Sequence, residues 1–354
     1  MITLHTISDQ TTYQDVLYDT IKTIEERQVQ LPPYVDPRGV PTIGIGFNLT
    51  VANIRQAVFA TLGVVEANYQ QQLRDAINAT YAAGDNTSLQ LALNAIMATR
   101  AADPTVTNGR ATFTFNNETE VRTTFNNVIQ TYENRLNTRM GGAPLANSLE
   151  RIALVSLVYQ SNNNITAGFV AAFNAGNRAE AWYELRYNTA LLTLPDNTDI
   201  RNGLAKRNFY SAEYFGLYND GVGPSNIGDD ESKSFYRMYT RHKEDIQQYQ
   251  TLLSVSVDTI VSNANRDYHT TIVQTLEVDL QPAKNFLITT FAPSGATIDG
   301  DVLVGASAGN YLNDSPVDAI AGTDKNDLIF GEGGNDAING MEGNDVIYGG
   351  NGSD

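Results

Sequence analysis

The stretch Tyr34-Val-Asp-Pro-Arg-Gly-Val-Pro-Thr-Ile-Gly-Ile-Gly-Phe47 decides how the first half of the chain folds. It holds one acid, Asp36, followed by proline and glycine and then by a run of β-branched residues and glycines. This pattern predicts a strand, a tight turn around Gly39 and a return strand.

An amphipathic helix is predicted over residues 12–26, because apolar side chains recur there every three or four positions. Thr12 with Asp15 resembles a capping box at its start. On a helical wheel, Glu25 falls at the edge of the apolar stripe and Glu26 falls nearly opposite it. We therefore expect Glu25 to be half-buried, an environment that raises the pKa of a carboxyl group, and Glu26 to face water.

These residues suggest a glycosidase, because glycoside cleavage needs one protonated and one ionised carboxyl group in different environments. Glu25 borders an apolar face and is the candidate proton donor. Asp36 lies in a polar turn beside Arg38, which favours the ionised form that a base requires. Thr42 adds a hydroxyl group to the same region. The chemistry alone leaves a plain alternative open, because Asp-Pro-Arg-Gly makes a good turn in any protein.

Composition excludes several classes of function. The 354 residues include 40 acidic and 23 basic side chains, for a formal net charge of −17, and 20 of the acids lie in residues 221–354 beside only 7 basic residues. Such acidity argues against a nucleic-acid partner. There is no cysteine, so a disulfide framework or a cysteine zinc site is impossible. The most apolar stretch, 152–159, is too short to span a membrane, and residues 1–6 do not resemble a signal peptide.

A nine-residue repeat fills the C-terminal stretch. Its segments begin at Gly322, Gly331, Gly340 and Gly349, and a degenerate copy begins near Asp301. Aspartates recur at intervals of nine residues, at Asp318, Asp327, Asp336, Asp345 and Asp354. An isoleucine stands two positions after each of the first four of them. We expect each segment to form a glycine turn and a short strand, half of a coil, so that carboxylates stack in rows and isoleucines form a thin core.

Rows of carboxylates repel one another unless a cation lies between them. Oxygen ligands without histidine or cysteine favour calcium, so Asp318, Asp327, Asp336 and Asp345 are the candidate metal ligands. A flexible glycine-rich linker is the alternative, but it does not explain the constant phase of aspartate and isoleucine. The pattern resembles the RTX nonapeptide repeats, which form a calcium-binding parallel β-roll. This resemblance implies a secreted protein, exported by a type I secretion apparatus, with an export signal beyond the repeats; we therefore expect the natural C-terminus to lie past Asp354.

A second resemblance covers residues 12–218 in segments. Ile21-Lys-Thr-Ile-Glu25, followed by the stretch quoted first, resembles the N-terminal signature of the phage-type lysozymes, the glycoside hydrolase family 24 muramidases. Further similar segments follow in the family's order, at residues 117–125, 151–160, 167–169 and 205–213. The resemblance implies hydrolysis of the β-1,4 bond between N-acetylmuramic acid and N-acetylglucosamine in bacterial peptidoglycan.

The same resemblance implies a role for each candidate. Glu25 matches the general acid, Asp36 the second catalytic acid on the water side of an inverting reaction, and Thr42 the residue that helps to place the water. Tyr159 and Gln160 match positions that contact sugar, although a packing role is equally open. The segment that joins the glutamates to Tyr34, residues 27–33, is about two residues longer than in the family. An alignment that starts from the hairpin and runs back toward the helix therefore favours Glu26 as the acid, whereas the helical wheel favours Glu25. A catalytically inactive, wall-binding or scaffolding module is the alternative function.

The sequence thus predicts an α+β protein in three parts. A mainly helical, lysozyme-like domain with a small β-hairpin lobe occupies residues 1–220, a helix with a connecting region occupies 221–295, and a parallel β-roll of RTX repeats occupies 296–354. The expected partners are peptidoglycan, calcium ions and a type I secretion apparatus, with no nucleic acid and no membrane span. Residues 254–290 mix β-branched and polar residues, which leaves a small β element or a linker open.

Overall fold

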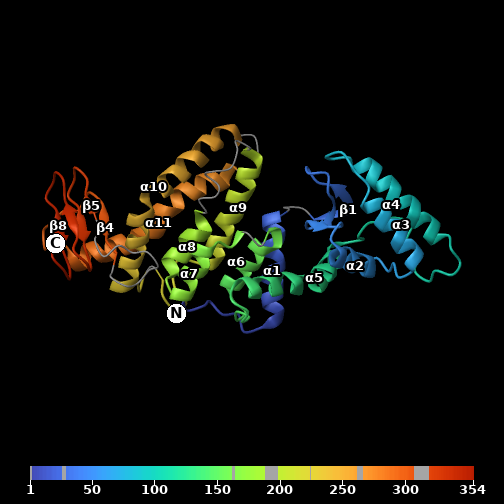
Figure 1. Ribbon diagram of the computed structural model, residues 1–354, viewed down its shortest axis with the longest axis horizontal. Coiled ribbons are helices and arrows are strands. Elements are labelled where there is room, and N and C mark those ends of the chain that lie inside the picture. Colours follow the sequence, from blue (N-terminus) through green and yellow to red (C-terminus); the bar gives the residue numbers. More distant parts are fainter. Residues whose placement is uncertain are drawn as a thin grey trace. The chain divides into compact units, whose positions relative to one another are not determined.

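The computed structural model describes residues 2–25, 29–161, 164–187, 198–223, 225–260, 266–306 and 319–354 (Figure 1). It mixes helices with strands, as the α+β prediction requires. The chain divides into two compact units, one of residues 7–145 and one of residues 1–6 with 146–354. The domain boundaries near residues 220 and 295, and the lysozyme-like architecture, stay predictions.

The unit of residues 7–145 combines five helices with a three-stranded antiparallel sheet in the order β1-β2-β3, counted over its described residues. Its elements in chain order are α1 (Gln10–Glu25), β1 (Gln30–Val35), β2 (Pro41–Gly44), β3 (Phe47–Asn48), α2 (Ala52–Thr61), α3 (Ala67–Ile77), α4 (Asn86–Ala101) and α5 (Glu118–Arg139). Asn117 caps α5, because its side chain accepts a hydrogen bond from the Glu120 N–H at 3.2 Å.

Helix α1 buries four residues of the predicted stripe, Tyr13, Leu17, Ile21 and Ile24, whereas Val16 is half-buried. Its predicted start is wrong. The helix begins two residues earlier, and the Asp9 carboxylate is the cap, accepting the Thr12 N–H at 2.6 Å and the Thr12 hydroxyl at 2.7 Å. Asp15, the predicted capping partner of Thr12, instead forms an ion pair with Arg122 of α5. Its carboxylate therefore joins two helices and does not cap one.

The second unit contains six helices among its described residues. They are α6 (Leu149–Gln160), α7 (Ala167–Ala175), α8 (Arg178–Arg186), α9 (Thr198–Phe215), α10 (Asp229–Ile260) and α11 (Arg266–Phe291). Every side chain of α6 from Ile152 to Tyr159 is buried, so the most apolar stretch of the sequence forms a core.

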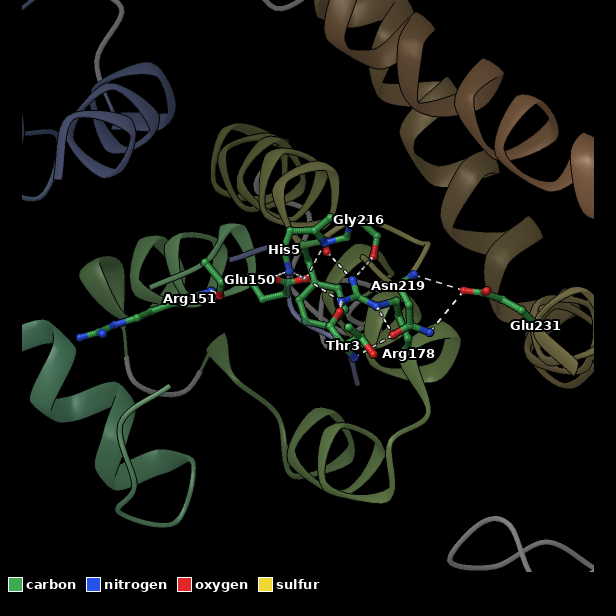
Figure 2. A network of polar contacts seen from close by, with 10 residues as sticks. Thr3, His5, Glu150, Arg151, Arg178, Gly216, Asn219 and Glu231 are labelled. Carbon is green, nitrogen blue, oxygen red and sulfur yellow. Dashed lines mark hydrogen bonds and ion pairs between the residues drawn. The ribbon is translucent and has the colours of Figure 1, made fainter. Parts of the chain in front are cut away.

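Figure 2 shows the polar network that fastens residues 3–5 to this unit. The fully buried Glu150 carboxylate accepts the His5 main-chain N–H and His5 Nδ1, the latter at 2.7 Å, and it pairs with Arg178 Nη2 at 2.5 Å. Arg178 also donates to the carbonyl oxygens of Thr3, Phe215 and Gly216 at 2.6–2.9 Å. Burial alone would raise the pKa of Glu150, but the hydrogen bonds from Arg178 and His5 outweigh it and lower that pKa below its ordinary value.

Residues 254–290, for which the sequence left a small β element or a linker open, contribute to two helices among the described residues. The β-branched composition suggested a small β element or a linker, but the described residues of the segment belong to α10, which ends at Ile260, and to α11, which begins at Arg266 and packs against α10. The described side chains explain this outcome, because Leu276, Leu280, Ala283 and Leu287 are buried at helical spacing. Burial of this stripe outweighs the weak β propensity of the individual residues.

The C-terminal repeats fold into short parallel strands, confirming the predicted glycine turns and strands (Figure 1). Strands alternate between two sheets, so two nine-residue segments complete one coil: β4 (Val302–Val304), β6 (Leu328–Phe330) and β8 (Val346–Tyr348) form one sheet, and β5 (Ala319–Ala321) and β7 (Ala337–Asn339) the other. Leu303, Ile320 and Ile329 are buried between the sheets, with Ile338 packed against them. Ile347 of β8 is 47 % exposed instead.

Candidate functional site

The hairpin predicted around Gly39 is present between β1 and β2. The Gly39 N–H donates to the Asp36 carbonyl oxygen at 2.9 Å, and the Asp36 N–H donates to the Val40 carbonyl oxygen at 3.0 Å. Gly39 has φ = +81°, and a Cβ atom there would lie 2.9 Å from the Tyr81 carbonyl oxygen. Glycine is therefore required at this turn by both backbone conformation and space.

The Asp36 side chain is held in one orientation by its own turn. Its Oδ1 accepts the main-chain N–H groups of Arg38 and Val40 at 2.8 and 2.9 Å. Its Oδ2 accepts Arg38 Nε and Nη2 at 3.1 and 3.0 Å. These four bonds use the roughly four acceptor positions of a carboxylate. The Asp36 side chain is only 13 % exposed, whereas Arg38 is 81 % exposed.

Thr42 lies on the return strand of the same hairpin, opposite Tyr34. It is 6 % exposed, and its hydroxyl donates to the Val40 carbonyl oxygen at 3.0 Å. The Val40 main chain therefore contacts both candidates, since its N–H donates to Asp36 and its carbonyl accepts from Thr42. The structure thus brings Asp36 and Thr42 together on one rigid element.

Glu25 is the last residue of α1, and the chain enters β1 five residues later. Its neighbour Ile24 is buried at 6 % exposure. The side chain of Glu25 and the whole of Glu26 lie outside the described residues. The predicted half-burial of Glu25, and the choice between the two glutamates as the acid, therefore stay predictions.

Tyr159 and Gln160 end α6 and belong to the other compact unit. Tyr159 is 8 % exposed, as a packing role requires. Gln160 is exposed, and its Oε1 accepts a hydrogen bond from Asn164 Nδ2 at 3.0 Å. Of the two, Gln160 has the side chain that solvent or a ligand can reach.

The repeat aspartates form rows with a spacing of 18 residues. Asp345 Oδ1 accepts the Asp327 N–H at 2.9 Å, and Asp354 Oδ1 accepts the Asp336 N–H at 3.1 Å. Consecutive aspartates therefore belong to different rows, which follows from the alternation of strands between two sheets. Asp327 and Asp336 are buried. Asp318, the remaining candidate ligand, lies outside the described residues.

The glycine turns place oxygen atoms where calcium ligands are needed. A Cβ atom on Gly322 would lie 2.5 Å from the Gly340 carbonyl oxygen and 2.6 Å from Asp327 Oδ2. Gly331 stands in the same relation to the Gly349 carbonyl oxygen and to Asp336 Oδ2, at 2.2 and 2.9 Å. Carboxylate and main-chain oxygens of successive coils thus converge beside the first glycine of a segment. This is a hard oxygen donor set that fits calcium.

Among the described residues, no group of three or more histidine, cysteine, aspartate or glutamate side chains gathers around one point. Calcium takes six to eight oxygen ligands, and main-chain carbonyls count among them. In the repeats, the Asp327 and Asp336 carboxylates with the carbonyls of the glycine turns would supply such ligands.

A family model of the RTX calcium-binding nonapeptide repeat matches residues 318–354 in four copies. The C-terminal stretch is therefore a set of RTX repeats, and calcium is the structural ligand that such repeats bind. No curated protein and no solved structure matches the chain. RTX repeats are typical of proteins exported by type I secretion, so the match is consistent with export. In the described part of the chain, no helix has both the length and the apolar character to cross a membrane.

Proposed function

We propose that this protein is a peptidoglycan hydrolase that cleaves the β-1,4 bond between N-acetylmuramic acid and N-acetylglucosamine and is exported with a calcium-folded RTX tail. One observation carries the proposal. A helix ending at Glu25 is followed, five residues later, by a hairpin that holds Asp36 and Thr42, and the main chain of Val40 bonds to both. This is the order of candidate residues along the chain that the resemblance to phage-type lysozymes implies.

In the proposed reaction, Glu25 protonates the oxygen of the leaving sugar, and Asp36 accepts a proton from the attacking water. Thr42 helps to position that water. Water attacks the anomeric carbon directly, so the configuration inverts, and the two carboxyl groups of an inverting enzyme stand roughly 6.5–9.5 Å apart to leave room for it.

Arg38 imposes a condition on this mechanism. Because its guanidinium occupies Asp36 Oδ2 through two hydrogen bonds, the attacking water must displace at least one of them. Such displacement is inexpensive, since an exposed ion pair contributes no more than about 1 kcal/mol. The two bonds to Oδ1 come from the main chain and would keep the carboxylate aligned during the exchange.

The same hydrogen bonds favour a second candidate function. An Asp36 whose acceptor positions are all used within its own turn is what a purely structural turn requires. A catalytically inactive module that binds the cell wall is therefore the alternative, and it differs from the first proposal in one measurable respect, the release of sugar reducing ends.

The test is hydrolysis of purified peptidoglycan by the full chain in calcium, followed by turbidity and by reducing ends released. Glu25→Gln and Asp36→Asn should each lower the rate by about 10²-fold or more, the usual contribution of an acid or base. Glu26→Gln should stay within about two-fold of the wild type, as should the matched control Asp75→Asn, an exposed acid that accepts a hydrogen bond from Gln71 Nε2.

Each outcome decides between the candidates. Full activity in Glu25→Gln with loss in Glu26→Gln would move the acid to Glu26. Wall binding by a wild type that releases no reducing ends would establish the inactive module and refute the hydrolase.

Calcium has a second proposed effect, on wall binding. Peptidoglycan is anionic, and a chain of net charge −17 is repelled by it, so bound calcium would offset part of that charge. Sedimentation with purified walls should show binding that rises with calcium, and equal binding in calcium and in chelator would refute this role.

A further inference from the structure

The first coil of the roll carries an aspartate in register with the repeats. Val302 of β4 pairs with Leu328 of β6, and Leu328 pairs with Val346 of β8, so the preceding residues Asp301, Asp327 and Asp345 fall in one row. The hydrogen bonds agree with this register. Asp327 Oδ1 accepts the Asp301 N–H at 2.5 Å, just as Asp345 Oδ1 accepts the Asp327 N–H. Each carboxylate therefore bonds the main chain of the coil before it.

Asp301 meets a helix instead of an earlier coil. Its Oδ2 accepts Lys243 Nζ of α10 at 2.6 Å. Next to it, the carbonyl oxygen of Gly300 accepts Lys284 Nζ of α11 at 2.9 Å. A carboxylate and a main-chain carbonyl are the two kinds of oxygen that converge at the glycine turns of the repeats. At this end of the row, both are satisfied by ammonium groups of the protein itself.

Other contacts hold the first coil in the same place. The Val304 N–H donates to Thr240 Oγ1 at 3.0 Å, and Arg237 Nε donates to the Gly305 carbonyl oxygen at 2.9 Å. Both partners lie on α10, along the same helix as Lys243. The first coil is thus bonded to the helices through both its side chains and its backbone, without any calcium ligand taking part.

We propose that Lys243 and Lys284 are built-in cations that replace calcium at the first coil of the RTX roll. The first coil then folds onto α10 and α11 in the absence of calcium and serves as the template on which the calcium-binding coils stack. In repeat proteins each unit is stabilised chiefly by its neighbour, so a preformed first unit lowers the cost of forming the next. The template should therefore lower the calcium concentration at which the later coils fold.

This inference rests on the RTX match and not on the proposed hydrolase activity. Its test is hydrogen–deuterium exchange of the full-length protein over a calcium series, read separately for peptides covering residues 299–306, 322–354 and 229–250. In calcium-free buffer, the wild type should protect 299–306 while 322–354 exchanges freely. Lys243→Met should remove that protection and raise the calcium midpoint for 322–354 by about five-fold or more.

Three variants control the comparison. Lys325→Met removes one positive charge from an exposed position within the repeats and should leave the midpoint unchanged. Asp301→Asn added to Lys243→Met removes the carboxylate that would otherwise be left without its ammonium, and it should recover much of the lost protection. Lys243→Arg keeps the cation and should behave like the wild type.

Two results would overturn the proposal. One is free exchange of 299–306 in the calcium-free wild type, because no template would then exist. The other is a midpoint in Lys243→Met equal to that in Lys325→Met. If peptide 229–250 shows that Lys243→Met loosens α10 itself, Lys284→Met carries the same test from α11, and the same two results apply to it.

Discussion

Arg178→Met should lower the stability of the helical unit by about 3–5 kcal/mol, because it removes one partner of a buried ion pair and leaves the other charge in place. Arg178 Nη2 pairs with Glu150, whose side chain has no exposed surface. Three main-chain carbonyl groups, of Thr3, Phe215 and Gly216, lose their Arg178 donor at the same time (Figure 2). Methionine keeps most of the length of the side chain, so the loss is chiefly polar.

The protein offers a local probe for this measurement. Its single tryptophan, Trp182, lies in α8 with Arg178 and is buried. Tryptophan fluorescence during urea unfolding therefore reports the unit that the substitution affects. With a slope of about 2 kcal/mol per molar urea, the expected loss lowers the midpoint by roughly 1.5–2.5 M.

The control is Asp229→Asn in the same unit. Asp229 pairs with Lys233 at 3.6 Å, and its side chain is 46 % exposed, so its removal should cost less than about 1 kcal/mol. Adding Glu150→Gln to Arg178→Met should restore part of the loss, because no uncompensated charge then remains buried. Arg178→Met with a midpoint equal to that of Asp229→Asn would refute the reasoning.

The pH dependence of the same pair has a defined sign. The folded-state pKa of Glu150 lies below its ordinary value of 4.5, because hydrogen bonds from Arg178 and His5 outweigh burial. The stabilisation is therefore present above pH 4.5 and is lost as the pH falls through the folded-state pKa. The difference in free energy of unfolding between the wild type and Arg178→Met should become smaller in acid. A difference that grows in acid would contradict the lowered pKa of Glu150.

The other predictions concern the roll and one buried acid. Ile329→Ala should destabilise the calcium-loaded roll by about 2–5 kcal/mol because Ile329 is fully buried, whereas Ile347→Ala at a 47 % exposed site should cost far less; equal losses in calcium-loaded thermal unfolding would contradict the core. Met341→Gly should stabilise the roll by about 1 kcal/mol, because Met341 has φ = +69°. Glu332→Gly should stabilise it less, since Glu332 at φ = +72° also forms two ion pairs with α10. The calcium concentrations at which the two variants fold would show which substitution stabilises the roll more. Burial raises the pKa of Asp279 from 3.8 to about 7, so the native state binds one more proton than the unfolded state between these pH values, and the free energy of unfolding should fall as the pH rises from about 4 to 7. Asp279→Asn should flatten this dependence of stability on pH in unfolding followed by Trp182 fluorescence. An unchanged pH dependence in the variant would exclude Asp279 as its cause.

Local chemistry is sufficient for the features that the sequence predicted correctly. The hairpin depends on a turn that needs glycine at one position. The roll depends on a nine-residue period in which each segment contains its own turn glycines and strand residues. The start of α1 was predicted wrongly although its cap is local, because Asp9 rather than Thr12 with Asp15 caps the helix. Residues 254–290 were left open for a different reason: α11 forms because burial of a stripe against the distant helix α10 outweighs β-branched composition.

Glu332 shows why the sequence pattern alone does not explain every position of the repeat. It stands where φ is positive and glycine is the favoured residue, at a cost of roughly 1–2 kcal/mol. Lys233 and Arg237 of α10 hold its carboxylate at 2.9 and 3.2 Å. The departure from glycine therefore has a compensating contact almost 100 residues away in the chain, which no local pattern indicates.

The candidate catalytic acid illustrates the same limit in the hairpin. The sequence identifies Asp36, its turn and its neighbour Arg38, but not which oxygen accepts which donor. In the structure, main-chain donors take Oδ1 and the guanidinium takes Oδ2. The two oxygens thereby acquire different properties: the main-chain donors are fixed by the turn, whereas the exposed guanidinium can leave. If Asp36 acts as the proposed base, Oδ2 is therefore the oxygen expected to accept the proton, and the exposed Arg38 guanidinium is the group that the water would have to displace.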